Sequence, residues 1–344
     1  MKVLVTGATG FIASRIIEQL LAGGHQVRGT VRSVAKTDAV TILGALPGAS
    51  ERLELVEADL LREGAFDAPC QGMDAVLHTA SPYMLDAKDP QRDLVDPAVH
   101  GTRNVLAAAA KAPTVRRMIV TSSMAAITDE PDSDRVLTED DWNTHSSLTR
   151  NPYYYSKVLA ERAAWDFVEQ TKPPFDLVVI NPFLVIGPSL MPAINTSNQV
   201  FIDLLSGTYP GIMNLTWGFV DVRDVADAHV RALENPRARG RYLTAGETIS
   251  MRDVVKLLAN RGWGTGRKLP KLGMDCAVGD FAVRLSSYFQ PKGVGSYLRT
   301  HVGRVPRYDT TKVRSELGLT FRPVTESILD TLADLERWGH LAKR

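Results

Sequence analysis

Tyr153 and Lys157 are the two residues of this sequence whose types and spacing best suit them to move a proton. They stand four positions apart in a stretch that begins with Asn151 and Pro152. That start is typical of a helix, on which both side chains would share one face. A free tyrosine has a pKa of about 10, and a neighbouring ammonium group lowers it. Such a tyrosine could protonate an alkoxide near neutral pH. The alternative is an aromatic core residue beside a surface lysine.

A glycine loop separates the first expected strand from the first expected helix. Gly7 and Gly10 follow the β-branched run 2–6, and apolar residues recur at helical spacing through 11–22. Glycines allow a tight turn there, and the helix start offers N–H groups and a positive dipole end to a pyrophosphate. Ala13 takes the place of the usual third glycine, where one methyl group can be accommodated. The sequence therefore predicts a dinucleotide site, the alternative being an ordinary strand-to-helix turn.

Arg32 bears on which dinucleotide binds. NAD-binding sheets place an acidic residue at the end of the second strand to hold the ribose 2′-hydroxyl, whereas here the strand ends in arginine and the nearest acid is Asp38. An arginine can bind a 2′-phosphate through charge-assisted hydrogen bonds of about 1.5–3 kcal/mol each. We therefore predict NADPH, with Lys36 as a second phosphate ligand and Asp59 and Leu60 at the adenine edge. The alternative is that Arg32 is a solvated charge.

The order of the expected elements predicts the fold class. The expected strands are 2–6, 26–32, 53–57, 75–79, 117–122 and 177–181, and the expected helices are 11–22, 96–112, 152–171, 221–234, 252–261 and 324–338. This alternation predicts an α/β fold with a doubly wound parallel sheet (Rossmann) and a smaller C-terminal substrate lobe. Residues 1–182 should form the dinucleotide-binding domain, with 217–240 returning to it. Residues 183–216 and 241–344 should form mainly the lobe.

Three further segments can be placed relative to the expected sheet. Ser123 lies at the carboxyl end of the fifth expected strand, where a side chain points into the ligand crevice and could hydrogen-bond a carbonyl. The alternative is a serine that caps the strand end. Residues 128–130 look like the acid/base triplet of nucleotide-sugar dehydratases, but they lie five residues beyond the position such a triplet needs. We interpret them as a loop, and we also expect the glycine-rich stretch 262–303 to be irregular.

Composition excludes several classes of protein. The chain has 344 residues, 44% of them hydrophobic and 23% charged, with 40 basic against 39 acidic residues. These are globular values without the excess charge of a nucleic-acid or membrane-surface binder. The sequence has no apolar run of membrane-spanning length and no signal-peptide pattern. Cys70, Cys276 and the scattered histidines lack metal-ligand spacing. We expect a cytoplasmic protein with no metal, nucleic-acid or membrane partner.

The whole sequence resembles the extended short-chain dehydrogenase/reductase family. It is most similar to the dihydroflavonol-reductase-like branch, which includes cinnamoyl-CoA reductases and fungal NADPH-dependent carbonyl (methylglyoxal) reductases. The motifs that carry the resemblance are Gly10-Phe11-Ile12-Ala13, His78-Thr79-Ala80-Ser81-Pro82, and the segments 138–143, 181–188, 195–197 and 219–229.

The resemblance implies an NADPH-dependent reductase of ketones or aldehydes with Ser123, Tyr153 and Lys157 as its catalytic triad. It implies cofactor contacts from Gly7, Thr9, Gly10, Phe11, Ile12, Arg32, Lys36, Asp59, Leu60, Thr79, Ala80, Ser81, Tyr153, Lys157, Pro182, Val185 and Ser197. The expected substrate pocket consists of Tyr83, Met84, Ala125, Phe183 and Met191. Thr128 stands where flavonol-type members carry an asparagine, which argues against a plant-type flavonoid reductase.

Two other classes of function stay open at this point. A sugar-nucleotide epimerase or dehydratase of the same fold would retain NAD without net consumption, and Arg32 argues against it. A non-enzymatic NADP-sensing regulator would keep the glycine loop but typically lacks the Tyr153–Lys157 pair. We expect a small-molecule carbonyl substrate and a monomer or homodimer, while the identity of the substrate and the stereochemistry of the alcohol stay open.

Overall fold

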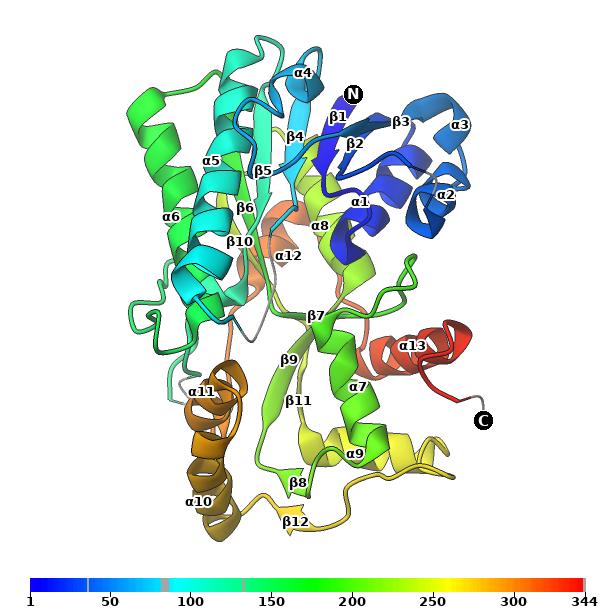
Figure 1. Cartoon of the computed structure of the whole chain (residues 1–344), viewed down its shortest axis with the longest axis vertical. Helices are drawn as coiled ribbons and strands as arrows, with labels where there is room; N and C mark the ends of the chain where they lie inside the picture. Colours follow the sequence, from blue (N-terminus) through cyan, green and yellow to red (C-terminus); the bar gives the residue numbers. More distant parts are fainter. Residues whose placement is uncertain (36, 82–86, 132–133, 343–344) are drawn as a thin grey trace.

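A seven-stranded parallel sheet forms the upper body of the molecule in the computed structural model, which describes residues 1–35, 37–81, 87–131 and 134–342 (Figure 1). Its strand order is β10-β6-β5-β4-β1-β2-β3. The bounds are β1 (Lys2–Thr6), β2 (Gln26–Val31), β3 (Leu53–Glu57), β4 (Ala75–His78), β5 (Arg117–Thr121), β6 (Asp176–Pro182) and β10 (Gly240–Thr244). The order reverses between β1 and β4, and ligands of doubly wound sheets bind in the crevice at such a switch point. The predicted fold class is confirmed.

Helices cover both faces of this sheet. Val3 and Val5 point into one core and Leu4 into the other, as the two-residue period of a strand requires. The first core includes side chains of α1 (Phe11–Ala22) and α8 (Val222–Glu234), with α2 (Asp38–Gly44), α3 (Ala49–Arg52) and α12 (Thr311–Leu317) at its margins. The second core includes side chains of α4 (Asp67–Cys70), α5 (Asp96–Lys111) and α6 (Pro152–Thr171). Continuous burial explains why the strands read as β-branched runs.

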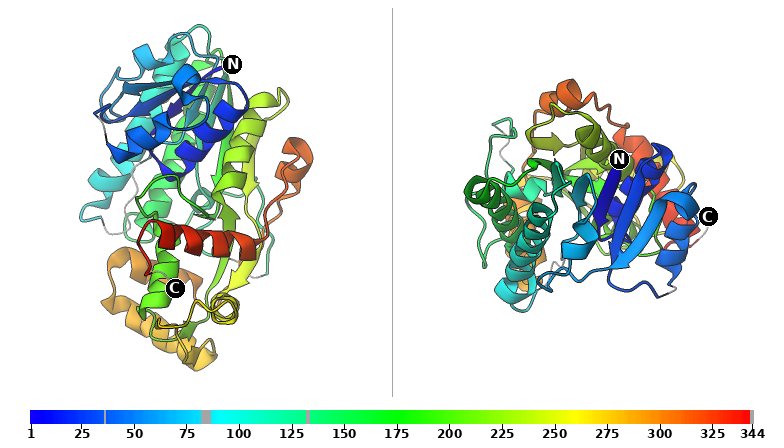
Figure 2. Two further views of the ribbon diagram at one scale, coloured as in Figure 1. Left: turned by 90° about the vertical axis from the view of Figure 1, so that its right-hand side faces the viewer. Right: turned by 90° about the horizontal axis from the view of Figure 1, so that it is seen from above.

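A second, lower lobe lies beneath the large sheet (Figures 1 and 2). It has its own core of buried side chains. A three-stranded sheet has the order β11-β9-β7, and β12 pairs with β8. The strands are β7 (Leu184–Ile186), β8 (Ile212–Met213), β9 (Thr216–Asp221), β11 (Thr248–Ser250) and β12 (Gly273–Met274). The helices are α7 (Thr196–Ser206), α9 (Met251–Asn260), α10 (Ala277–Ser286), α11 (Lys292–His301) and α13 (Val324–Arg337). Short helical turns lie at η1 (Gln91–Val95), η2 (Met124–Ala126) and η3 (Ser287–Phe289).

The expectation that 262–303 is irregular was wrong, because α10 and α11 lie there. The glycines that suggested loops serve close backbone approach instead. A Cβ at Gly279 would lie 1.9 Å from the carbonyl oxygen of Met274, and one at Gly295 would lie 2.2 Å from that of Ser287. Small residues inside a helix can thus mark packing as well as a break.

The division into domains stays a prediction, to which the fold adds two observations. α8 packs against α1, in keeping with a return of this segment to the dinucleotide-binding half. β9 joins the small sheet, whereas β10 forms an edge of the large one. The large sheet therefore takes a strand from a segment that we had assigned mainly to the lobe.

Helix α13 holds the segment that follows β7 of the small sheet. Thr331 Oγ1 accepts a hydrogen bond from the amide of Gly187 at 2.8 Å, and Asp334 accepts one from the amide of Ser189 at 2.7 Å. Arg15 on α1 donates to the carbonyl of Pro188 between them at 2.8 Å. The backbone after β7 is thereby fixed from both sides. Over the described residues, no helix has the length and apolar character needed to cross a bilayer.

Candidate active site

The glycine loop at the end of β1 is shaped to receive a phosphate group. Gly7 has φ +67°, a conformation that favours glycine, and a Cβ there would lie 3.1 Å from the Cβ of Ala80. Gly10 precedes α1 without a side-chain cap, so no capping side chain competes for the N–H groups of the first turn. Ala13 is buried and packs in the core, as expected for the third-glycine position. These features fit a dinucleotide pyrophosphate.

Thr6 and His78 hold the neighbouring loop after β4 beside the glycine loop. Thr6 Oγ1 accepts hydrogen bonds from the amides of Thr79 and Ala80, each at 3.1 Å, and lies 2.9 Å from His78 Nδ1. Burial, followed by the charge of Lys157, lowers the pKa of His78 to about 3. The imidazole is therefore neutral at physiological pH and shares one hydrogen bond with the Thr6 hydroxyl. The sequence motif pointed to this loop but not to the role of His78.

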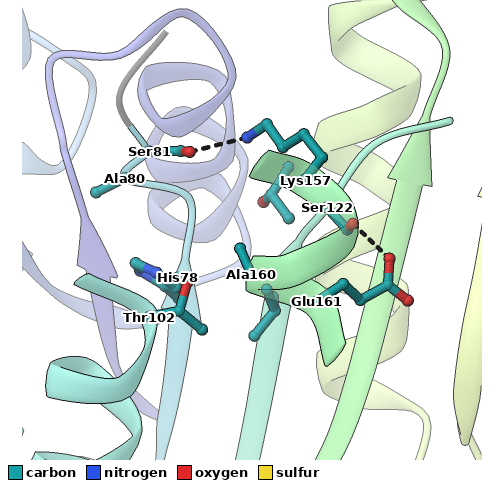
Figure 3. A pocket seen from close by; sticks show the side chains of 10 residues that line it. His78, Ala80, Ser81, Thr102, Ser122, Lys157, Ala160 and Glu161 are labelled. Carbon is teal, nitrogen blue, oxygen red and sulfur yellow. Dashed lines mark hydrogen bonds between the residues drawn. The ribbon is translucent and has the colours of Figure 1, made fainter. Parts of the chain in front are cut away.

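Lys157 connects that loop to the tyrosine helix (Figure 3). Its Nζ donates to Ser81 Oγ at 2.9 Å and lies 5.5 Å from the ring centre of Tyr153. Burial lowers the pKa of Lys157 to about 8, so most of the group is charged at neutral pH. A buried ammonium beside a phenol stabilises the phenolate. The structure thus brings the two residues together as their spacing predicted.

Ser123 lies just after β5, at the carboxyl edge of the large sheet. It precedes η2 in extended conformation, and its Oγ accepts a hydrogen bond from the amide of Ala125 at 3.1 Å. η2 packs against α6, so the segment that Ser123 precedes lies beside the helix that carries Tyr153 and Lys157. A hydroxyl there can donate to a carbonyl oxygen while its own oxygen accepts from the backbone.

Asn151 does not cap α6 through its side chain as expected. Its backbone is left-handed, with φ 48°, and its Nδ2 donates to Asp129 O at 3.2 Å and to Thr300 Oγ1 at 3.3 Å. Its amide donates to Ser296 Oγ at 3.0 Å. Ser296 and Thr300 belong to α11, so the lobe itself holds the start of the tyrosine helix. Residues 128–130 form a loop, as predicted.

The remaining predicted cofactor residues are spread over several strands, loops and helix starts. Thr9, Phe11 and Ile12 belong to the glycine loop and α1, Asp59 and Leu60 follow β3, Pro182 ends β6, Val185 lies in β7 and Ser197 lies in the first turn of α7. Arg32 follows β2, is exposed, and has no hydrogen bond or ion pair with another described residue. It is thus available to a ligand. Lys36 lies outside the described residues.

The predicted substrate pocket is only partly described. Ala125 lies in η2, and Phe183, which follows β6, packs with its ring centre 5.2 Å from that of Tyr308. Met191 is buried in the core that includes side chains of α1 and α8. Tyr83 and Met84 lie outside the described residues. Across the part of the chain that the structure describes, no three His, Cys, Asp or Glu side chains are placed to hold a metal ion.

Sequence reasoning missed Glu161, which is fully buried below Lys157. Ser122, Lys157 and Glu161 line one pocket together with His78 and Ser81. A signal was present, because Glu161 follows Lys157 by four residues and Tyr153 by eight, which places all three on one helix face. The partners of Glu161, however, come from distant parts of the chain, so local spacing could not reveal them.

The parallel sheet, the glycine loop at its switch point and the Tyr153–Lys157 helix define a Rossmann-type dinucleotide-binding protein. The family described as the NAD dependent epimerase/dehydratase family matches residues 3–246. The chain belongs to this family, and the predicted membership of the extended short-chain dehydrogenases/reductases is confirmed.

Characterised relatives match almost the whole chain. It is 38% identical to cinnamoyl-CoA reductase CAD2 of Medicago truncatula, covering 97% of this chain and 95% of the relative. It is 35% identical to tetraketide alpha-pyrone reductase 1 of Arabidopsis thaliana, covering 99% and 97%. The crystal structure of yeast methylglyoxal/isovaleraldehyde reductase Gre2 complexed with NADPH is similar with a TM-score of 0.81, 30% identity and 99% coverage of both chains.

Proposed function

We propose that this protein is an NADPH-dependent reductase that converts ketones or aldehydes to alcohols. The observation that carries the proposal is the buried Lys157 ammonium, which lies beside Tyr153 and is hydrogen-bonded to Ser81 of the loop next to the glycine loop. The sequence relatives are named as reductases, and the yeast structure is an NADPH complex, which supports the same chemistry.

Ser123, Tyr153 and Lys157 have different roles in the reduction of the carbonyl group. When bound, NADPH supplies a hydride for the carbonyl carbon. Ser123 donates a hydrogen bond to the carbonyl oxygen and orients it. Tyr153 gives its phenolic proton to that oxygen as negative charge develops there. Lys157 stabilises the resulting phenolate, and the same ammonium is placed to hold ribose hydroxyls.

The binding residues account for the choice of cofactor. The glycine loop and the start of α1 hold the pyrophosphate, and the loop of Thr79, Ala80 and Ser81 closes the site beside Gly7. Arg32 binds the 2′-phosphate through charge-assisted hydrogen bonds. Its exposure and lack of a described partner support this role.

A spectrophotometric screen tests the proposal. NADPH oxidation is followed with aldehydes, diketones, ketoesters and a dihydroflavonol. We expect oxidation with at least one carbonyl class and stoichiometric formation of alcohol. Purification with tightly retained NAD and no net cofactor consumption would indicate an epimerase or dehydratase instead. Binding of NADPH without turnover of any carbonyl would indicate a sensor.

The cellular setting belongs to the same proposal. We propose a cytoplasmic protein that acts on a small molecule as a monomer or homodimer. The two cysteines, one buried and one exposed, are both free thiols, in keeping with a reducing compartment. Fractionation of cells and light scattering of the purified protein test location and oligomeric state.

A further inference from the structure

The carboxylate of Glu161 is a buried junction between the tyrosine helix and the strand ends. Its side chain has no exposed surface. It accepts hydrogen bonds from Ser122 Oγ at 2.5 Å, from Asn181 Nδ2 at 2.8 Å and from Arg241 Nε at 2.6 Å. Ser122 follows β5, Asn181 lies in β6 and Arg241 lies in β10, so one carboxylate joins three adjacent strands to α6.

Two of these contacts lead directly to the proposed catalytic serine. Ser122 is its neighbour in the chain. Asn181 Nδ2 donates a second hydrogen bond to the carbonyl oxygen of Ser123, at 3.3 Å. Hydrogen bonds of Asn181 therefore link the backbone of Ser123 to the carboxylate that lies on the Tyr153–Lys157 face of α6.

Arg241 balances the charge of this junction and extends it. Its side chain is 7% exposed, and it donates to the backbone carbonyls of Glu139 and Asp141 at 2.7 and 2.5 Å. Its guanidinium lies 4.1 Å from the ring centre of Trp142. A buried ion pair is poor evidence for stability alone, because desolvation offsets the attraction. Compared with an apolar contact, such a pair adds directional hydrogen bonds to fixed partners.

We propose that Glu161 is a positioning residue, which sets the place of Ser123 relative to Tyr153 and Lys157. This inference rests on the proposed function. Glu161 acts by binding Ser122, Asn181 and Arg241, and it touches no reacting atom. Reaction rates are sensitive to such placement, since a displacement of 1 Å can cost about a hundredfold.

The variant Glu161→Gln tests the proposal. The amide keeps the size of the side chain but replaces one carboxylate oxygen by an NH₂ group, which cannot accept. It then faces two donors, either Ser122 and Asn181 or Arg241 and Trp165, and disturbs the contacts on that side. We expect kcat per bound NADPH to fall about tenfold or more, while the dissociation constant of NADPH stays within about twofold. Counting sites by NADPH titration removes any misfolded fraction from the comparison.

The ion pair of Arg117 and Asp176 supplies a matched control. It joins the opposite, amino-terminal ends of β5 and β6 and buries Arg117, with bonds of 3.0 and 2.8 Å. Asp176→Asn should lower the Tm but leave kcat within about twofold, because the site lies at the other edge of the sheet. A comparable loss of kcat in this control would show that any loosening of the sheet suffices, and would overturn the proposal.

The remaining outcomes are separated by two further variants. If Glu161→Gln does not fold, Asn181→Ala cuts the same link to Ser123 and should also lower kcat per bound NADPH about tenfold. Unchanged kcat per site in either folded variant would overturn the positioning role. Turnover by Tyr153→Phe would overturn the proposed function itself, whereas an inactive Tyr153→Phe with a fully active Glu161→Gln would overturn the positioning role alone.

Discussion

Lys157 on α6 and Ser81 after β4 are joined by a hydrogen bond of 2.9 Å beside the switch point of the sheet. The bond ties the proposed proton-donating helix to the loop beside Gly7. The serine hydroxyl accepts from the ammonium, so it also fixes the direction in which the lysine side chain points. The loop after β4 and the helix that carries the proposed proton donor are thus directly connected, and we refer to them below as one unit.

Removing the Ser81 hydroxyl should loosen this unit. In Ser81→Ala the Lys157 ammonium loses a partner at a buried site, which costs about 1–3 kcal/mol. We expect a lower kcat and weaker NADPH binding, measured by steady-state kinetics and fluorescence titration. Ser50→Ala, which alters an exposed residue of α3 ahead of β3, serves as the control. Equal kinetics of Ser81→Ala and the unaltered protein would refute the coupling.

The pH dependence of reduction should report Lys157. Its pKa of about 8 means that the ammonium is present below this pH and is lost as the pH rises through it. Without that charge the Tyr153 phenolate is less stable, so proton donation becomes less favourable. The value of kcat/KM for NADPH, which reports the free enzyme, should decline above about pH 8. A profile that stays flat to pH 10 would contradict this assignment.

Arg32 should decide between the two nicotinamide cofactors. Arg32→Ala removes the proposed ligand of the 2′-phosphate, and each charge-assisted bond is worth about 1.5–3 kcal/mol. We expect the KM for NADPH to rise about tenfold or more while the KM for NADH changes little. Arg237→Ala, which removes an exposed charge between α8 and β10, controls for charge alone. An equal loss for both cofactors would reject the phosphate role.

Three buried histidines should make the protein sensitive to acid. Burial lowers the pKa of His78 to about 3, of His229 to about 4 and of His301 to about 3. Between these values and about 6.5 the unfolded chain binds more protons, so stability falls as the pH falls through this window.

Urea denaturation at pH 7 and pH 5 measures this effect. Each histidine contributes about 1.4 kcal/mol per pH unit inside the window, and the loss at pH 5 should amount to several kcal/mol. His229→Gln should show a smaller loss, since one of the groups is removed. An unfolding free energy that is the same at both pH values would exclude the prediction.

Much of the fold followed from local signals in the sequence. The helices Phe11–Ala22 and Pro152–Thr171 begin and end where they were expected, because glycine or proline marks their starts and apolar spacing runs through their lengths. The glycines of α10 and α11 misled the same reasoning, since their purpose is close packing against backbone. Local patterns do not reveal what approaches from elsewhere in the chain.

The residues of the site also differ in how far local sequence patterns could predict them. Tyr153 and Lys157 are neighbours on one helix, so their spacing was enough to pair them. Glu161 binds groups that are 39, 20 and 80 positions away, and no local pattern links it to them. Contacts of that kind depend on the order of the strands in the sheet. The sequence predicted a doubly wound parallel sheet but not that order.

The variant Tyr153→Phe tests the central claim most directly. It removes one hydroxyl and leaves the glycine loop, Lys157 and Ser81 in place. NADPH oxidation is measured with the best carbonyl substrate from the screen, and NADPH binding is measured on the same preparation. We predict that turnover is lost while the dissociation constant of NADPH is nearly unchanged. Near-normal turnover by Tyr153→Phe would contradict the account.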